Sequence, residues 1–312
     1  MAPVNDLPDI LETTEAERLA SGFLFTEGPL WHPDGYYYFV DYRANRLHRI
    51  TPGQAPELVR ETAAGNGTTF DLQGRLLVCE SDMRAVTRTG HDGKVEILAD
   101  RYKGGRFNRP NDIVCRSDGS IFFTDPSMRV PHGKREIPGE AGENNVWHGA
   151  NVYRIAPDGA VSAVAACEYP NGLAFSPDER TLYVANSRSS KYIHAIEVDA
   201  AGRMVRRRIF ADLNADDPVG GPDGLKVDSL GRVYCTGPGG IWVCTSEGKH
   251  IGIIRFPEQP INFTFGGADL KTMFCCAHTS IYTLRMKTPG LPHPWYRLRM
   301  PQGSSDKLVA PP

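Results

Sequence analysis

Short apolar runs recur in pairs along most of the chain, and a turn signal rich in Asp, Gly, Pro or Ser separates the two runs of each pair. One pair occupies residues 171–185 and has Ser176-Pro177-Asp178 as its turn, and another occupies residues 223–235. Two apolar runs joined by such a turn are typical of a β-hairpin. The pattern therefore predicts an all-β chain that is built from hairpins.

Six hairpins of this kind begin at equivalent places in a repeat. Each opens with a side chain that carries a carbonyl oxygen, and these residues are Glu27, Asn66, Asn111, Asn171, Asp223 and Asn262. The intervals between them are 39, 45, 60, 52 and 39 residues. Strands that repeat every 40–50 residues or so are the signature of a β-propeller. The sequence thus predicts a six-bladed β-propeller with four-stranded blades.

The repeat also suggests how the chain is divided. We expect residues 1–17 to form an N-terminal extension, residues 18–300 a single propeller domain and residues 301–312 a C-terminal tail. Little regular structure is expected after Met286, so Leu19 to Phe25 is predicted to supply the outer strand of the last blade and to close the ring. Blade three has an insertion at residues 126–150, which is either a lid over the channel mouth or a mobile loop.

Composition and charge exclude several classes of partner. The formal net charge is −2, which argues against nucleic acid or an anionic membrane as the main partner. We find neither a membrane-spanning apolar stretch nor the layout of a signal peptide. The seven cysteines include no C-x-x-C pair, which favours reduced, buried thiols over a zinc-thiolate site. We therefore expect a cytoplasmic protein that acts on a small molecule, and the oligomeric state stays open.

The six oxygen-bearing residues predict a central metal-binding channel, because equivalent positions in a propeller form a ring around one axis. Hard divalent cations prefer carboxylate and carboxamide oxygens. Glu27, Asn171 and Asp223 would give two negative charges and one neutral carbonyl, which suits Ca²⁺, Mg²⁺ or Mn²⁺. The alternative is that Asn and Asp only cap turns before glycine. That alternative explains Asn171 and Asp223 singly, but it does not explain Glu27 in the same register.

A second series of polar residues follows the ring residues by fourteen or fifteen positions, and it consists of Asp41, Glu80, Asp125 and Asn186. These residues either cap strand ends or hydrogen-bond the metal ligands. Arg109 precedes Asn111 by two positions, and it either binds hydroxyls or a carboxylate of a polar substrate or forms an ordinary surface salt bridge. The sequence has no G-x-S-x-G motif and no P-loop, so serine-hydrolase and NTPase interpretations have no support.

A resemblance to a known family rests on four motifs in order along the chain. They are Glu27-Gly28-Pro29-x-Trp31, Arg109-Pro110-Asn111-Asp112, Pro170-Asn171-Gly172-Leu173-Ala174-Phe175-Ser176-Pro177-Asp178 and Pro222-Asp223-Gly224-Leu225-x-Val227-Asp228. Together they resemble the senescence marker protein / gluconolactonase family from about residue 20 to 285. That family consists of six-bladed propellers that bind one divalent metal in the channel, and many of its members hydrolyse sugar lactones.

The resemblance implies a role for each matching residue. Glu27, Asn171 and Asp223 match the metal ligands, and Asp223 also matches the proposed general base. Asn111 matches an asparagine beside the metal and the substrate, and Arg109 matches an arginine that contacts substrate. Ca²⁺ is the expected ion, while Zn²⁺, Mg²⁺, Mn²⁺ and Fe²⁺ stay open.

The function that the sequence predicts is hydrolysis of a sugar-acid lactone. A cation would polarise the lactone carbonyl, and Asp223 would take a proton from the attacking water or hold a water that the cation activates. Arg109 and Asn111 would orient the ring. Two alternatives stay open: a phosphotriesterase-like activity at the same site, and a ligand-sensing or interaction propeller whose metal is structural.

Overall fold

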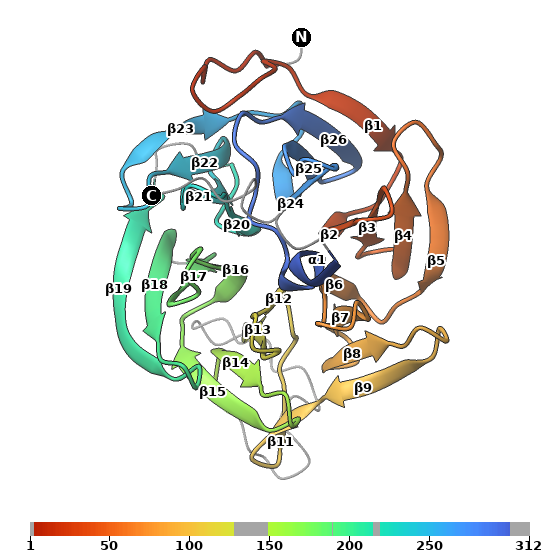
Figure 1. Cartoon of the computed structure of the whole chain (residues 1–312), viewed down its shortest axis with the longest axis vertical. Coiled ribbons are helices and arrows are strands. Elements are labelled where there is room, and N and C mark those ends of the chain that lie inside the picture. Colours follow the sequence, from red (N-terminus) through yellow and green to blue (C-terminus); the bar gives the residue numbers. More distant parts are fainter. Residues whose placement is uncertain (1–2, 128–148, 189, 215–218, 300–312) are drawn as a thin grey trace.

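The computed structural model describes residues 3–127, 149–188, 190–214 and 219–299. Within these residues, six four-stranded antiparallel sheets are arranged around one axis (Figure 1). The predicted six-bladed propeller with four-stranded blades is confirmed. The predicted lid at residues 126–150 and the tail at 301–312 fall largely or wholly outside the described residues, and the division into extension, propeller and tail stays a prediction.

Blades one to five each run from the innermost strand outward in chain order. Blade one contains β2 (Thr26–His32), β3 (Tyr36–Asp41), β4 (Arg46–Ile50) and β5 (Glu57–Glu61). Blade two contains β6 (Gly65–Phe70), β7 (Leu76–Glu80), β8 (Ala85–Thr89) and β9 (Val95–Ala99). Blade three contains β12 (Ile113–Cys115), β13 (Ile121–Asp125), β14 (Asn151–Ile155) and β15 (Val161–Ala166).

The next two blades follow the same order, and a short hairpin lies between blades two and three. Blade four contains β16 (Pro170–Phe175), β17 (Thr181–Asn186), β18 (Tyr192–Val198) and β19 (Met204–Asp212). Blade five contains β20 (Leu225–Val227), β21 (Val233–Gly237), β22 (Gly240–Cys244) and β23 (His250–Ile254). The short hairpin consists of β10 (Arg101–Tyr102) and β11 (Gly105–Arg106).

Blade six joins the two ends of the propeller. It contains β24 (Pro260–Gly266), β25 (Thr272–Ala277), β26 (Ser280–Arg285) and, as its outer strand, β1 (Glu17–Ser21), which pairs with β26. Closure by the N-terminal segment is confirmed, but the predicted boundary at Leu19 to Phe25 is wrong. The strand ends before Gly22, which has a φ of +96°, and the N–H groups of Leu24 and Phe25 donate to the carboxylate of Asp41 at 2.9 and 3.0 Å instead.

Burial follows the distance of a strand from the axis. All residues of the inner strand β16 are buried, whereas seven of the nine residues of the outer strand β19 are exposed. Neighbouring blades pack face to face, as where Tyr37 of blade one stacks on Phe274 of blade six at 4.2 Å between ring centroids. The segment before β1 joins this packing, since Ile10 and Leu11 are 2% and 5% exposed. Inner strands are therefore buried whether their residues are apolar or polar, because neighbouring blades cover both of their faces.

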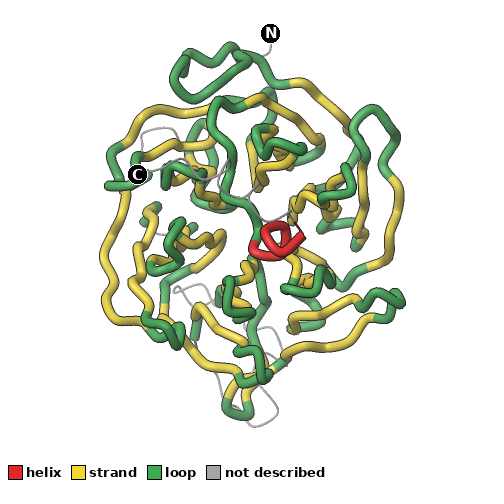
Figure 2. Tube along the Cα trace, in the orientation of Figure 1, coloured by secondary structure: helices red, strands yellow, loops and turns green. Residues whose placement is uncertain are grey.

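The C-terminal segment crosses one end of the channel and forms the helix α1 (Pro294–Arg299), which lies near the axis (Figures 1 and 2). Gly290 bridges to Asp228, and the Tyr296 hydroxyl donates to the carbonyl of Trp31. The sequence did not predict this helix, because six residues are too few to show a helical period. Among the residues described, no helix is long and apolar enough to cross a membrane.

Candidate functional site

The six ring residues lie at or just before the start of the inner strands, and we call this end of the channel the mouth. Asn262 Nδ2 donates to Glu27 Oε2 at 2.9 Å and so connects blade six to blade one. The N–H of Gly172 donates to the carbonyl of Asp223 at 3.1 Å and connects blade four to blade five. Because these bonds join neighbouring blades, the ring predicted from the repeat exists as a set of contacts.

The glycines that follow ring residues allow this close approach. A Cβ atom on Gly28 would lie 2.1 Å from the carbonyl oxygen of Asn66, and one on Gly172 would lie 2.0 Å from that of Asp223. Asn171 and Gly172 lie within β16 and not in a turn. The alternative that Asn171 only caps a turn is therefore wrong, and the Asn-Gly pair reflects contact between inner strands.

The three predicted metal ligands meet at the mouth. Glu27 and Asn171 are 3% and 6% exposed, and Asp223 is half-buried. Glu27 Oε2 also accepts from the N–H of Gly28 at 2.8 Å. Asn171 Nδ2 donates to Ser187 Oγ at 2.9 Å, while Asn171 Oδ1 is buried and accepts no hydrogen bond from any described residue. A buried amide oxygen without a partner is costly unless a ligand completes it.

The electrostatics of the mouth favour a cation. Burial, and then the charge of Asp112, raise the pKa of Glu27 to about 7. Burial, and then the charges of Glu27 and Asp112, raise the pKa of Asp223 well above its usual range. Lys226 acts in the opposite direction on both carboxyl groups. Three carboxylates and one ammonium leave two negative charges, so a divalent cation held by oxygen ligands fits the residues present.

Sequence reasoning did not assign Asp112 or Lys226. Asp112 is 3% exposed and its Oδ1 accepts from the N–H of Ile113 at 2.9 Å. Lys226 Nζ lies 3.8 Å from Asp112 Oδ2 and donates to the carbonyl of Leu225 at 3.0 Å and to Asn262 Oδ1 at 3.4 Å. The signal that the sequence offered for Lys226, and that was not used, is a lysine within an otherwise apolar inner-strand run.

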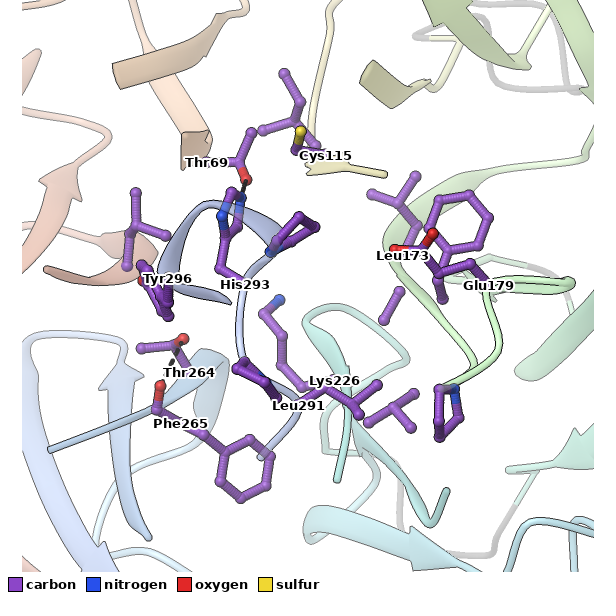
Figure 3. A pocket seen from close by; sticks show the side chains of 18 of the residues that line it. Thr69, Cys115, Leu173, Glu179, Lys226, Thr264, Phe265, Leu291, His293 and Tyr296 are labelled. Carbon is purple, nitrogen blue, oxygen red and sulfur yellow. Dashed lines mark hydrogen bonds between the residues drawn. The ribbon is translucent and has the colours of Figure 1, made fainter. Parts of the chain in front are cut away.

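A cavity of about 140 Å³ lies at the opposite end of the channel, beneath the C-terminal segment. Figure 3 shows Lys226 extending toward the interior of this pocket, with His293 bonded to Thr69. His293 Nε2 lies 3.2 Å from Thr69 Oγ1, and burial lowers the pKa of His293 to about 3. The C-terminal segment therefore contributes a neutral histidine to the lining of this end of the channel.

Arg109 and Asn111 lie at the mouth, as predicted. The Arg109 guanidinium forms an ion pair with Asp82 of blade two, and its Nη2 also donates to the Tyr42 hydroxyl of blade one at 3.1 Å. The Asp82 side chain is 57% exposed. Asn111 is half-buried, and its carbonyl accepts from the N–H of Gly67 at 2.7 Å. The ion pair anticipated as an alternative for Arg109 exists, and it holds the guanidinium over the mouth.

The second polar series holds the loops that lead into the inner strands. Asp125 accepts from the N–H groups of Asn108 and Arg109 at 2.8 and 2.7 Å. Asn186 accepts from the N–H of Tyr169 at 2.9 Å, and Asp41 and Glu80 bind loop N–H groups in the same manner. These contacts agree with the capping alternative, and they orient the ring through the backbone.

Comparison with known proteins gives consistent matches. The family model described as the SMP-30/Gluconolactonase/LRE-like region matches residues 25–279. A gluconolactonase from Zymomonas mobilis is 30% identical over 301 positions, which cover 89% of this chain and 83% of that protein. A regucalcin from Xenopus laevis is 27% identical over 259 positions, which cover 80% and 81%. A solved gluconolactonase structure from Xanthomonas campestris matches with a TM-score of 0.79 at 33% identity and covers 91% of this chain and 94% of that one.

Proposed function

Because the chain belongs to the SMP-30/gluconolactonase family, as its four motifs predicted, we propose that it is a divalent-metal-dependent hydrolase that opens a sugar-acid lactone. The gluconolactonases among its relatives support the reaction class. The observation that carries the metal requirement is the buried Oδ1 of Asn171, which has no hydrogen-bond partner among the described residues and lies beside Asp223.

Glu27, Asn171 and Asp223 would hold the cation, with Ca²⁺ as the first choice because each donor atom is a hard oxygen. A divalent cation bound there supplies Lewis-acid stabilisation of charge on the carbonyl oxygen and makes a nearby water more acidic. Glu27 is already fixed by Gly28 and Asn262. Its position therefore suits a ligand that stays in place during the reaction.

Asp223 is the proposed general base. The Asn171 side chain hydrogen-bonds its carboxylate, and the other lone pairs of the two carboxylate oxygens can accept a proton from the attacking water. A cation bound beside Asp223 favours the ionised form of its carboxyl group, and the ionised carboxylate is the form that accepts a proton from water. In this scheme the water attacks the lactone carbonyl, the ring C–O bond breaks, and the proton leaves with the new hydroxyl group.

Arg109 and Asn111 are proposed to orient the substrate ring. Asp82 and Tyr42 both accept hydrogen bonds from Nη2 of Arg109. These bonds orient the planar guanidinium and so set the direction of its other N–H groups. These N–H groups, held in one plane, suit hydrogen bonds to the lactone hydroxyl groups that take no part in the reaction. Asn111 adds a half-buried amide on the same blade.

The test uses metal-loaded protein and a panel of sugar-acid lactones, and the release of acid is monitored with a pH indicator. We expect hydrolysis that disappears on chelation, returns with added Ca²⁺ or another divalent ion, and exceeds any turnover of a phosphotriester such as paraoxon. Circular dichroism checks that the fold survives chelation. Faster turnover of the phosphotriester would favour the first alternative. Metal binding without any hydrolysis would favour the sensing or interaction propeller and would refute this proposal.

A further inference from the structure

The rim of the mouth carries a second repeat of residues. Two positions beyond each member of the second polar series stand, in blades one to four, Arg43, Asp82, Ser127 and Arg188. Asp82 already pairs with Arg109. The two remaining arginines belong to blades one and four, which lie across the channel from one another (Figure 1).

Each of these arginines covers an aromatic ring of its own blade. The Arg43 guanidinium lies 5.1 Å from the ring centroid of Phe25, and that of Arg188 lies 4.3 Å from the ring centroid of Tyr169. Phe25 precedes Glu27 by two positions, and Tyr169 precedes Asn171 by two positions. The same arginine–aromatic arrangement therefore flanks two proposed metal ligands on opposite sides of the mouth.

The arrangement on blade four is tied directly to the ring. Ser187, the neighbour of Arg188, accepts from Asn171 Nδ2 at 2.9 Å and donates its own N–H to the Tyr169 carbonyl at 3.1 Å. Tyr169 in turn donates its N–H to Asn186 at 2.9 Å. These bonds tie Ser187 and Tyr169 to the ring, so Arg188 follows directly on a residue that is bonded to the proposed ligand.

Among the described residues, no carboxylate pairs with either of these two arginines. Neither guanidinium forms an ion pair or donates a hydrogen bond within the part of the chain that the structure describes, whereas Arg109 does both. Both side chains are exposed. A guanidinium stacked on a ring keeps the N–H groups along its edge available, and that edge matches the oxygens of a carboxylate or phosphate. An anion is the ligand that completes such a site.

We propose that Arg188, assisted by Arg43 across the mouth, binds an anionic group of the substrate, so that the preferred substrate is a lactone carrying a carboxylate or phosphate remote from its carbonyl. The proposal rests on the lactone hydrolysis proposed above and specifies the substrate class of that site. A neutral sugar lactone would reach the same ring residues but would leave both guanidinium groups without a partner.

The experiment compares two lactones that differ at one carbon. D-glucono-1,4-lactone has a neutral hydroxymethyl group at C6, and D-glucaro-1,4-lactone has a carboxylate there. With metal-loaded protein at low ionic strength, we expect kcat/KM to be about tenfold or more higher for the anionic lactone, the low end for a hydrogen bond to a charged group. A second pair, glucono-1,5-lactone with and without a 6-phosphate, decides between carboxylate and phosphate. Equal or lower kcat/KM for both anionic members would overturn the proposal.

Variants assign the preference to Arg188. Arg188→Met keeps the length of the side chain and removes its charge, and it is expected to lower the anionic-to-neutral ratio of kcat/KM about tenfold, mainly through KM. Arg203→Met makes the same change of charge in a salt-bridged arginine on the turn between β18 and β19, at the other face, and it should leave the ratio unchanged. An unchanged ratio in Arg188→Met, or the same fall in Arg203→Met, would refute the role of Arg188.

A binding measurement separates this proposal from the proposed function. If no lactone is hydrolysed, the function proposed above fails, and calorimetry with the open-chain acids then decides the anion site. D-glucarate should bind about tenfold tighter than D-gluconate to the metal-loaded protein, and Arg188→Met should remove that difference. Equal binding of the two acids by the unaltered protein would exclude the anion site.

Discussion

The closest contact at the mouth yields the sharpest prediction, which concerns Gly172. In Gly172→Ala, the new methyl group would lie 2.0 Å from the carbonyl oxygen of Asp223 and 2.7 Å from the nitrogen of Leu225. Both atoms belong to the backbone, so no side-chain rotation relieves the overlap. An ordinary contact begins near 3.4 Å, so the inner strands of blades four and five must separate by about 1.4 Å.

This separation acts on the candidate metal site and on stability. Ligand distances tolerate only about 0.2 Å, so moving Asn171 away from Asp223 should weaken metal binding by roughly 10–100-fold. Overpacking typically costs about 1–3 kcal/mol, and a rigid backbone contact places this variant near about 3 kcal/mol. Because the entropy of unfolding grows with chain length, the melting temperature of the metal-free protein should therefore fall by about 5 °C.

The assay is thermal unfolding with and without Ca²⁺, together with calorimetric titration of the metal. Gly221→Ala is the matched control, because its methyl group would meet nothing nearer than the Ser187 carbonyl oxygen at 3.6 Å. We expect this control to keep normal stability and metal affinity. If Gly172→Ala binds metal as tightly as the unaltered protein, then close packing of the inner strands does not position the ligands, and the argument for the ring is refuted.

Four further predictions follow from the site. Asp223→Asn, assayed at saturating metal with occupancy measured, should lower kcat about 10²–10⁴-fold, and near-normal kcat would exclude Asp223 as the base. Glu27→Gln removes one of the two ligand charges, so calorimetry should show weaker metal binding, and an unchanged affinity would contradict its assignment as a ligand. Arg109→Ala should raise KM more than it lowers kcat; a fall in kcat alone would place Arg109 in the chemical step. Burial lowers the pKa of His293 to about 3, so between about pH 6.5 and pH 3 the unfolded chain binds more protons than the folded one. The free energy of unfolding should therefore decrease as the pH is lowered through this range, by at most about 1.4 kcal/mol per pH unit. His293→Gln should flatten this dependence in urea titrations, and an identical slope would contradict the assignment.

The sequence alone predicted the blades and the ring because both depend on local pattern. Turn signals between apolar runs define hairpins wherever they occur, and the interval between copies follows from counting. The repeat by itself places Glu27, Asn171 and Asp223 in one ring with Asn66, Asn111 and Asn262, since repeat-equivalent positions share one height around an axis. The resemblance to the family, which the match over residues 25–279 confirms, singled out Glu27, Asn171 and Asp223 as the predicted metal ligands.

Contacts between distant segments escaped that reasoning. The ion pair of Arg109 with Asp82, the approach of Lys226 to Asp112 and the contact of α1 with the channel each join residues far apart in the chain. No periodicity records such pairs, because each depends on how neighbouring blades are rotated and packed. The same holds for the glycines that follow ring residues, because a Cβ atom at these positions would overlap the backbone of the next blade.

The sequence by itself determined the fold class, the number of blades and the chemical types at the ring, because hydrophobic alternation, turn residues and repeat spacing are properties of short segments. Only the tertiary structure decided which charges meet, which amide oxygen stays without a partner and which arginines keep their charge unpaired among the described residues. Those properties follow from burial and from distances of a few ångströms between blades, and such distances exist only once the ring has closed.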